Sequence, residues 1–228
     1  MMVSTTQPLQ LKDWTKALNP LAHTGINGSE FRSAYAAFLK HEPVSAINHI
    51  IAAGRGSHWQ HWVDERRARQ AAHLANTPVS INIPELLELP EFTLGGAYAR
   101  HIVNQGFDPE AFMSSSDSPE NWVEQRMALS HDVYHIITGF DGSPMGEFGL
   151  AGFCFVQFWD LLNAFVLSFL PLQIASNFKQ APQLFGSLIK GFIMGMKSKP
   201  IFAYQFEANW NKPVSEVRQE LGISGFVK

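Results

Sequence analysis

Apolar positions recur at helical spacing along most of this chain, and regular alternation of polar and apolar residues is almost absent. After Ser29, an apolar stripe predicts one helix, and Pro43 and Gly54 bracket a second. A third helix is expected to follow Ser57, with its tryptophans inward and the basic cluster Arg66, Arg67 and Arg69 facing water. Residues 94–105 predict a further helix closed by Gly106, whereas the proline-bounded residues 81–90 are typical of a connector.

The second half of the chain is richer in long apolar runs. Ser118-Pro119 and Ser143-Pro144 each predict an N-cap followed by the first residue of a helix. Residues 151–170 approach the length of a membrane span, but Asp160 at its centre would cost about 2.5–3.5 kcal/mol on insertion scales. We therefore favour a buried central helix with one solvated polar edge, which is formed by Gln157, Asp160 and Asn163.

Beyond that helix, Pro171 predicts a break or kink. The next apolar stripe favours a core helix, although its flanking lysines would also suit an anionic membrane; its members are Phe185, Leu188, Ile189, Phe192, Ile193 and Met196. In the same segment, Gly191 and Gly195 would let two helices approach closely. Pro213 and Gly222 bracket a last short helix.

Together these elements predict an all-α fold, a single-domain multi-helix bundle over residues 11–228 after a disordered N-terminus of residues 1–10. Two small domains are the alternative. The chain has 18 phenylalanines, and only 16% of its 228 residues are charged. This apolar content is higher than a small water-soluble enzyme needs, which indicates a hydrophobic ligand or a membrane surface. A net charge of −3 argues against nucleic-acid binding. The N-terminus has neither a secretory nor a transit pattern, which predicts a cytoplasmic protein.

One short segment carries candidate chemistry. His131 and His135 are one helical turn apart, and Asp132 lies at the edge of their shared face. Gly139 to Ser143 predicts a turn, which would place Glu147 roughly 6 Å beyond it, level with His135 roughly 6 Å before it. Two imidazoles and two carboxylates form a mixed shell that suits zinc, iron, manganese or cobalt. A surface hairpin whose polar residues hydrogen-bond one another remains the alternative.

The same residues resemble a known family. The run from His131 to His135, followed after eleven residues by Gly146-Glu147, is similar to the HDxxH-x11-E signature of the Coq4 family of coenzyme Q (ubiquinone) biosynthesis proteins, here as a bacterial homologue. Weaker matches extend the resemblance over roughly residues 30–225, and they are Leu89-Pro90, Leu94-Gly95, Tyr98, Arg126, Trp210 and the stretch from Pro213 to Ile223.

This resemblance implies an all-helical protein with a divalent metal at His131, Asp132, His135 and Glu147. Zinc is favoured, with iron, manganese, cobalt and magnesium left open. It further implies binding of a polyprenyl lipid or prenylated quinone precursor and peripheral association with the inner face of a bacterial membrane. Other quinone-biosynthesis proteins are expected partners, and the chain is expected to form a homo-oligomer such as a homodimer. Oxidative decarboxylation at ring carbon one of the prenylated head group is the activity credited to the family.

If the resemblance holds, further residues are expected to bind the head group and the isoprenoid tail. Arg126 is expected to bind a carboxylate or phosphate of the head group. The isoprenoid tail is expected to lie along apolar side chains that follow Glu147, where about 0.8 kcal/mol per buried methylene would dominate binding. Its expected lining is Phe155, Trp159 and Leu162 on one side of the helix and Phe158 and Phe165 on another.

Two alternatives belong to other classes of protein. The first is a non-catalytic lipid-binding scaffold. Its metal would only crosslink the two helices of the hairpin, so the same metal and lipid residues would be used without turnover. A metal-dependent phosphohydrolase of the HD type would instead use His101, the His131-Asp132 pair and Asp160, which occur in suitable order. That reading leaves His135 and Glu147 without a role.

Overall fold

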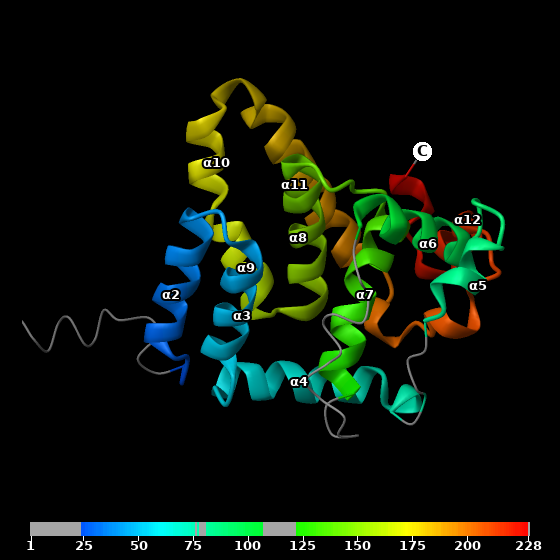
Figure 1. Ribbon diagram of the computed structural model, residues 1–228, viewed down its shortest axis with the longest axis horizontal. Helices are drawn as coiled ribbons and strands as arrows, with labels where there is room; N and C mark the ends of the chain where they lie inside the picture. Colours follow the sequence, from blue (N-terminus) through cyan, green and yellow to red (C-terminus); the bar gives the residue numbers. More distant parts are fainter. Residues whose placement is uncertain (1–23, 76, 78–80, 107–121, 228) are drawn as a thin grey trace, which may run out of the picture. The chain divides into compact units, whose positions relative to one another are not determined.

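The computed structural model describes residues 24–75, 77, 81–106 and 122–227 (Figure 1). Within these ranges every regular element is an α-helix or a short 3₁₀ helix, and β pairing is limited to an isolated bridge between Thr93 and Pro213. The all-α prediction is therefore confirmed. The expected disorder of residues 1–10 and the expected N-cap at Ser118-Pro119 lie outside the described residues.

The chain forms two compact units, residues 1–62 and residues 63–228. In the first unit, α2 (Gly28–Leu39) lies against α3 (Pro43–Gly54). Asn27 caps α2 by accepting hydrogen bonds from the backbone of Ser29 and Glu30. The Glu30 carboxylate meets Nδ1 of His49 on α3 at 2.7 Å, which ties the two helices together. The boundary between the units falls within α4 (His58–Gln70).

The second unit contains the remaining described helices: α5 (Ile83–Leu87), α6 (Leu94–Gln105), α7 (Trp122–Thr138), α8 (Pro144–Phe158), α9 (Leu161–Ser168), α10 (Leu170–Ser176), α11 (Ala181–Lys197) and α12 (Val214–Leu221). The predicted ends of α6 and α12 are confirmed, because Gly106 and Gly222 terminate them in the left-handed conformation. The expected connector at 81–90 contains the short helix α5, which the side chain of Asn82 caps by accepting from Glu85 N.

A buried core holds the second unit together. It draws on α6, α7, α8, α11 and α12, with large members that include Tyr98, Ile102, Val133, Ile137, Leu150, Phe153, Phe202, Val217 and Leu221. Each buried side chain of this size contributes roughly 1.5–3 kcal/mol relative to exposure. The core therefore fixes the helices on which the candidate site is built.

Helices α8 and α11 lie side by side in especially close contact (Figure 1). A Cβ atom added to Gly191 would meet the carbonyl oxygen of Gly149 at 2.0 Å, and one added to Gly195 would meet that of Phe153 at 2.8 Å. Both separations are far below van der Waals contact, so only glycine permits this approach. The prediction that Gly191 and Gly195 let two helices approach is confirmed.

The expected continuous helix at 151–170 is wrong. α8 ends at Phe158, Trp159 adopts a left-handed backbone (φ 57°), and α9 begins after Asp160. Asp160 stops the helix because its Oδ1 caps α9, accepting from the Asn163 backbone at 2.8 Å. The predicted solvated edge is wrong for Asp160, which is buried, whereas Gln157 and Asn163 are half-buried. The Gln157 amide donates to Gly195 O at 2.6 Å and accepts from Ile201 N at 3.0 Å.

The basic cluster of α4 is only partly solvated. Arg67 is buried, and its Nη2 donates to Oδ2 of Asp160 at 2.6 Å, while its guanidinium lies 5.2 Å from the centre of the Phe158 ring. The expectation that these arginines all face water is therefore wrong for Arg67. An arginine can be buried in this way because an equally buried carboxylate neutralises it and accepts its hydrogen bond.

The apolar stripe of α11 is divided between core and surface. Leu188 is buried, whereas Phe185, Ile189 and Met196 are 44, 55 and 66% exposed. Among the described residues, no single helix has the length and hydropathy of a membrane span. One bent pair, Leu161–Ser176 with Phe178–Lys197, meets the criterion jointly, with a 116° angle between its halves.

Candidate metal centre

The candidate site is built on the hairpin formed by α7 and α8. α7 ends at Thr138, and Gly139 turns the chain with a left-handed backbone. Asp141 Oδ1 accepts from the Ser143 backbone at 3.1 Å, and Ser143 Oγ accepts from Gly146 N at 3.2 Å. Ser143 and Pro144 are the N-cap and first residue of α8, as the sequence predicts.

Gly146 allows the first turn of α8 to pack against this connection. A Cβ atom at position 146 would lie 2.0 Å from the carbonyl oxygen of Asp141, which is backbone and cannot move aside. Glycine at this position therefore fixes the distance between the turn and α8. The next residue is Glu147, so the same close contact sets the carboxylate opposite α7.

The predicted ligands converge across the hairpin. One ligand atom from each of His131, Asp132 and His135 lies within 4.8 Å of the other two, and Glu147 Oε1 is 3.4 Å from His135 Nε2. Donors bound to one zinc ion at about 2.0–2.1 Å are separated by roughly 3.3 Å in a tetrahedral shell. The three donors of α7 are therefore within about 1.5 Å of this spacing, and Glu147 faces them through its contact with His135.

The orientation of His135 fits such a role. Its Nδ1 lies 2.8 Å from the carbonyl oxygen of Phe140. Since a carbonyl can only accept, Nδ1 carries a proton, and Nε2 is the ring nitrogen that faces Glu147 and is available to a metal. Backbone carbonyls fix metal-binding histidines in this way in many sites.

His101 on α6 is a site residue that the motif does not reveal. Its Nε2 lies 3.7 Å from Oδ1 of Asp132, and its ring stacks on that of His135 with 5.7 Å between centres. Thirty residues separate it from Asp132 in the sequence. The only signal was its place in the HD-type alternative, because periodicity within α6 does not say which helix covers that face.

The pKa values of the two carboxyl groups, Asp132 and Glu147, are shifted in opposite directions. Burial alone would raise the pKa of Asp132, but the neighbouring imidazoles of His101, His131 and His135 hold that pKa below its usual value. Burial raises the pKa of Glu147, and the nearby Asp132 adds to this effect. Asp132 is thus the more stable anion, and Glu147 is the carboxyl group better suited to hold a proton.

His131 is poised to remain neutral. Although the residue is exposed at the surface, the protein packed around its ring and the neighbouring His135 lower its pKa to about 4. A neutral imidazole is the form that binds a metal. His131 can therefore offer a lone pair to a metal at neutral pH.

The HD-type alternative lacks one of its members. The structure does bring His101 to Asp132, but Asp160 lies outside the ligand cluster found among the described residues. Its two oxygens are used by Arg67 and by Asn163. His135, which the HD-type alternative leaves without a role, is a member of the cluster, and Glu147 lies 3.4 Å from it.

Arg126 occupies a structural position. It is buried, and its guanidinium donates to Glu207 Oε1 at 2.8 Å and to the carbonyl oxygens of Phe202 and Tyr204. These contacts tie α7 to the segment that precedes α12. The structure thus places Arg126 on protein acceptors, and it is not part of the head-group site proposed below.

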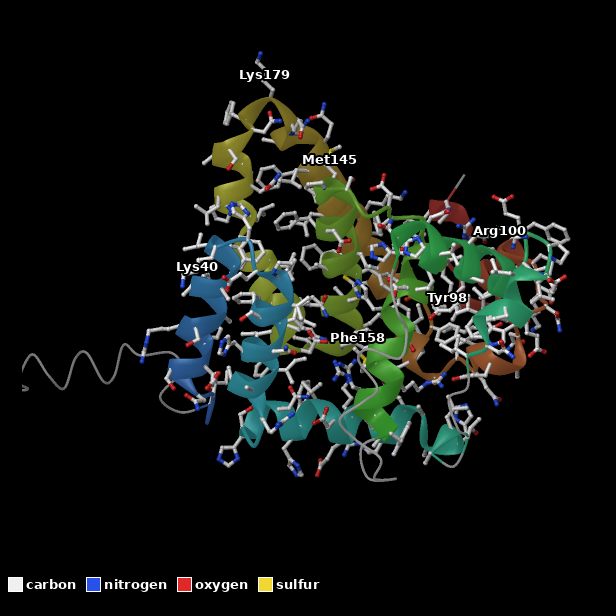
Figure 2. All side chains as sticks on the ribbon, viewed as in Figure 1. Lys40, Tyr98, Arg100, Met145, Phe158 and Lys179 are labelled. Atoms are coloured by element: carbon white, nitrogen blue, oxygen red, sulfur yellow. The ribbon has the colours of Figure 1, made fainter. Side chains whose placement is uncertain are left out.

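The expected tail-lining residues differ in accessibility. Phe158 and Phe165 are buried, and Phe158 packs on Tyr134 beside α7 with 5.6 Å between ring centres (Figure 2). Phe155 and Leu162 are half-buried, and Trp159 is exposed with its ring 5.4 Å from that of Phe155. Phe155, Trp159 and Leu162 are therefore the accessible members of the expected lining, but the helix break at Trp159 means that Leu162 does not share a helical face with the other two.

Known proteins are similar to this chain over most of its second unit. The family model described as "Coenzyme Q (ubiquinone) biosynthesis protein Coq4" matches residues 71–226. A mitochondrial ubiquinone biosynthesis protein Coq4 of Aspergillus niger is 30% identical over 154 residues, which cover 64% of this chain and 51% of that protein. The Coq4 protein of Debaryomyces hansenii is 26% identical over 151 residues, which cover 64% and 46%. The chain thus spans about half the length of these relatives.

A solved structure supports the fold. A protein of Nostoc punctiforme PCC 73102, crystallised as a candidate ubiquinone biosynthesis protein, superposes with a TM-score of 0.72 at 22% identity. The match covers 87% of this chain and 99% of the Nostoc chain. Because the family model spans all the helices that build the candidate metal centre, this chain belongs to the Coq4 family of coenzyme Q (ubiquinone) biosynthesis proteins.

Proposed function

We propose that this protein acts in ubiquinone biosynthesis by binding one divalent metal at His131, Asp132, His135 and Glu147 and by holding a prenylated quinone precursor beside it. The observation that carries the proposal is the convergence of these donors from two helices, with His135 and Glu147 3.4 Å apart. The mixed nitrogen and oxygen shell favours zinc and also suits iron, manganese or cobalt.

The residues around the metal have distinct roles in this proposal. A bound divalent ion would supply Lewis-acid stabilisation of the negative charge that develops on the head group. Asp132 stays anionic through its contact with His101, and His135 is held in one tautomer by the Phe140 carbonyl. Glu147, whose pKa burial raises, is the group proposed to hold or release a proton beside the substrate.

The tail of the precursor is proposed to lie along Phe155, Trp159 and Leu162. Within this strip, Trp159 is exposed and the other two side chains are half-buried, and Phe155 lies about two helical turns beyond Glu147 in α8. Burying a methylene contributes about 0.8 kcal/mol, so a long tail would supply most of the affinity. A long prenyl alcohol should therefore raise the melting temperature far more than a short one, and Trp159→Ser should reduce that difference. Equal shifts for long and short compounds would exclude the strip.

Access to such a lipid is proposed to come from a membrane surface. Phe185, Ile189 and Met196 leave an apolar face of α11 exposed, and Lys190 and Lys197 are exposed on the same helix. Flotation with anionic vesicles should show binding that salt weakens, because exposed charges are screened within about 8 Å at physiological ionic strength. Ile189→Asp should reduce this binding, and unchanged binding would show that the face is not used.

Metal content tests the central claim. Protein purified without added metal or chelator is analysed for its elements, alongside His135→Ala, Glu147→Ala and the control His73→Ala, an exposed histidine outside the cluster. We expect close to one ion per chain in the wild type and in the control, and loss in the two site variants. Wild-type metal content in the double variant His131→Ala/His135→Ala would overturn the site.

Turnover separates an enzyme from a scaffold. We propose oxidative decarboxylation of the head group as the reaction, and it is tested by release of labelled carbon dioxide from a carboxyl-labelled prenylated hydroxybenzoate under air. Release that Glu147→Ala abolishes supports catalysis. Tight binding of the same compound by metal-loaded protein without any release would leave the lipid-binding scaffold as the function.

A further inference from the structure

A groove with a volume of about 580 Å³ opens beside the candidate metal centre. Its walls come from α6, from the end of α7 with the following turn, and from the start of α12, and among the lining residues are His101, Gln105, His135, Phe140, Ser215 and Arg218. These elements all belong to the second unit (Figure 1). The volume lies within the range of small-molecule sites.

The groove reaches both sides of the metal cluster. His135 lines it directly, and the stacked ring of His101 lies beside it. At the rim, a Cβ atom at Gly142 would be 3.7 Å from the Gln105 amide nitrogen and 4.0 Å from Oε1 of Glu147. A molecule in the groove would therefore contact His135, one of the four residues proposed to hold the metal, and His101 beside it.

Arg218 is the fixed cation of this groove. Its Nε and Nη2 donate to the carbonyl oxygens of Ile137 and Ile136, each at 2.9 Å, at the C-terminus of α7. Among the described residues no carboxylate forms an ion pair with it, in contrast to Arg126, which meets Glu207. Two hydrogen bonds thus pin the planar guanidinium while Nη1 donates to no described acceptor.

The other groups suit an aromatic anion. Phe140 and Ile136 give an apolar wall for a ring, and Gln105 offers an amide donor. Asp141 also lines the groove and stays ionised, with its Oδ1 accepting from the Ser143 backbone and hydroxyl, so the attraction for an anion comes from Arg218. A pinned guanidinium beside an apolar wall fits a planar carboxylate on a ring better than it fits a free phosphate ion.

We propose that this groove binds the carboxylate of an aromatic head group and that Arg218 is the residue that selects the charged form. The proposal deepens the function proposed above and rests on it, because it supplies the head-group site that Arg126 does not provide. In this arrangement the carboxylate lies against Arg218, and the ring lies along the wall that leads to His135.

The test uses 4-hydroxybenzoate as probe, 4-hydroxybenzamide as its neutral isostere and inorganic phosphate as the competing anion, with binding measured by calorimetry on zinc-loaded protein. We expect wild type to bind the benzoate at least about tenfold more tightly than the benzamide or phosphate. Arg218→Gln should remove that preference while zinc content remains at the wild-type level.

Arg218→Gln also removes two bonds to α7, so a second pair of variants leaves the arginine in place. Ser215 is exposed on the groove wall, and Ser215→Glu should weaken benzoate binding several-fold while Ser215→Lys strengthens it. Ser224→Glu, an exposed serine outside the groove, is the matched control and should change nothing.

The two proposals fail differently. Absence of any divalent metal from wild type, together with failure to take up zinc, would overturn the proposed function. Normal zinc content together with equal affinities for benzoate and benzamide, or identical binding by Ser215→Glu and Ser224→Glu, would overturn the groove. Phosphate bound as tightly as benzoate, with the same dependence on Arg218, would overturn the assignment to an aromatic carboxylate.

Discussion

Replacing Gly191 by alanine tests the close packing that supports the site. The new Cβ atom would lie 2.0 Å from the carbonyl oxygen of Gly149, and ordinary contact begins at 3.4 Å, so α8 and α11 must separate by about 1.4 Å at this point. Overpacking of this kind costs about 1–3 kcal/mol, and the obstacle here is helical backbone, which places the cost at the upper end. The better helix propensity of alanine offsets about 1 kcal/mol of it.

The expected net loss is about 2 kcal/mol, which for a chain of this size lowers the melting temperature by about 4–8 °C. Gly186 on the same helix is the matched control, because a Cβ atom there meets nothing within 4 Å. Gly186→Ala should gain up to about 1 kcal/mol and melt a few degrees higher. The same substitution on one helix is thus expected to have opposite signs at two positions.

Metal content should follow stability in this pair. Gly149 is two residues from Glu147, so a displaced α8 would move the Glu147 carboxylate from its position 3.4 Å from His135. Thermal melts monitored by circular dichroism and elemental analysis provide the two measurements. If Gly191→Ala melted at the same temperature as Gly186→Ala and kept its metal, the argument from close helix packing would be refuted.

Three further predictions concern the site and its frame. His101→Ala should weaken zinc binding by about 10- to 100-fold in a competition titration, because Asp132 loses its partner; an affinity equal to that of the control His73→Ala would contradict this. Arg126→Ala should lower the free energy of unfolding by about 3–5 kcal/mol by leaving the Glu207 charge buried, and chemical denaturation should show that Arg126→Met/Glu207→Met recovers most of the loss. Metal-free protein should lose stability as pH falls from 6.5 to about 4, because His131 takes up a proton in the unfolded chain but not in the folded one, and His131→Gln should flatten this part of the denaturation profile.

Much of the local structure was determined by the sequence alone. The caps at Ser143-Pro144 and the ends at Gly106 and Gly222 were predicted correctly. The facing of His135 and Glu147 across the hairpin was also predictable. All of these features depend on residues within about a dozen positions of one another, where helix rise and turn geometry fix the distances.

The helix boundary at Trp159 could not be predicted in this way. The run from 151 to 170 is apolar enough to continue as one helix, and Asp160 reads as a polar edge. Asp160 becomes a cap with a buried charge because Arg67, 93 positions away, lies against it. Hydropathy reports which residues avoid water, but it does not report which distant charge will neutralise a carboxylate.

The residues of the candidate site likewise fall into those that the sequence predicted and those that only the tertiary structure revealed. The motif determined the four residues proposed as metal ligands, since they lie on one hairpin. Only the tertiary structure brought His101 from α6 to Asp132, placed Arg218 from α12 in the groove, and used Arg126 as an internal tie. Helical periodicity defines which face of a helix is buried, whereas the identity of the helix that covers that face depends on packing across the whole second unit.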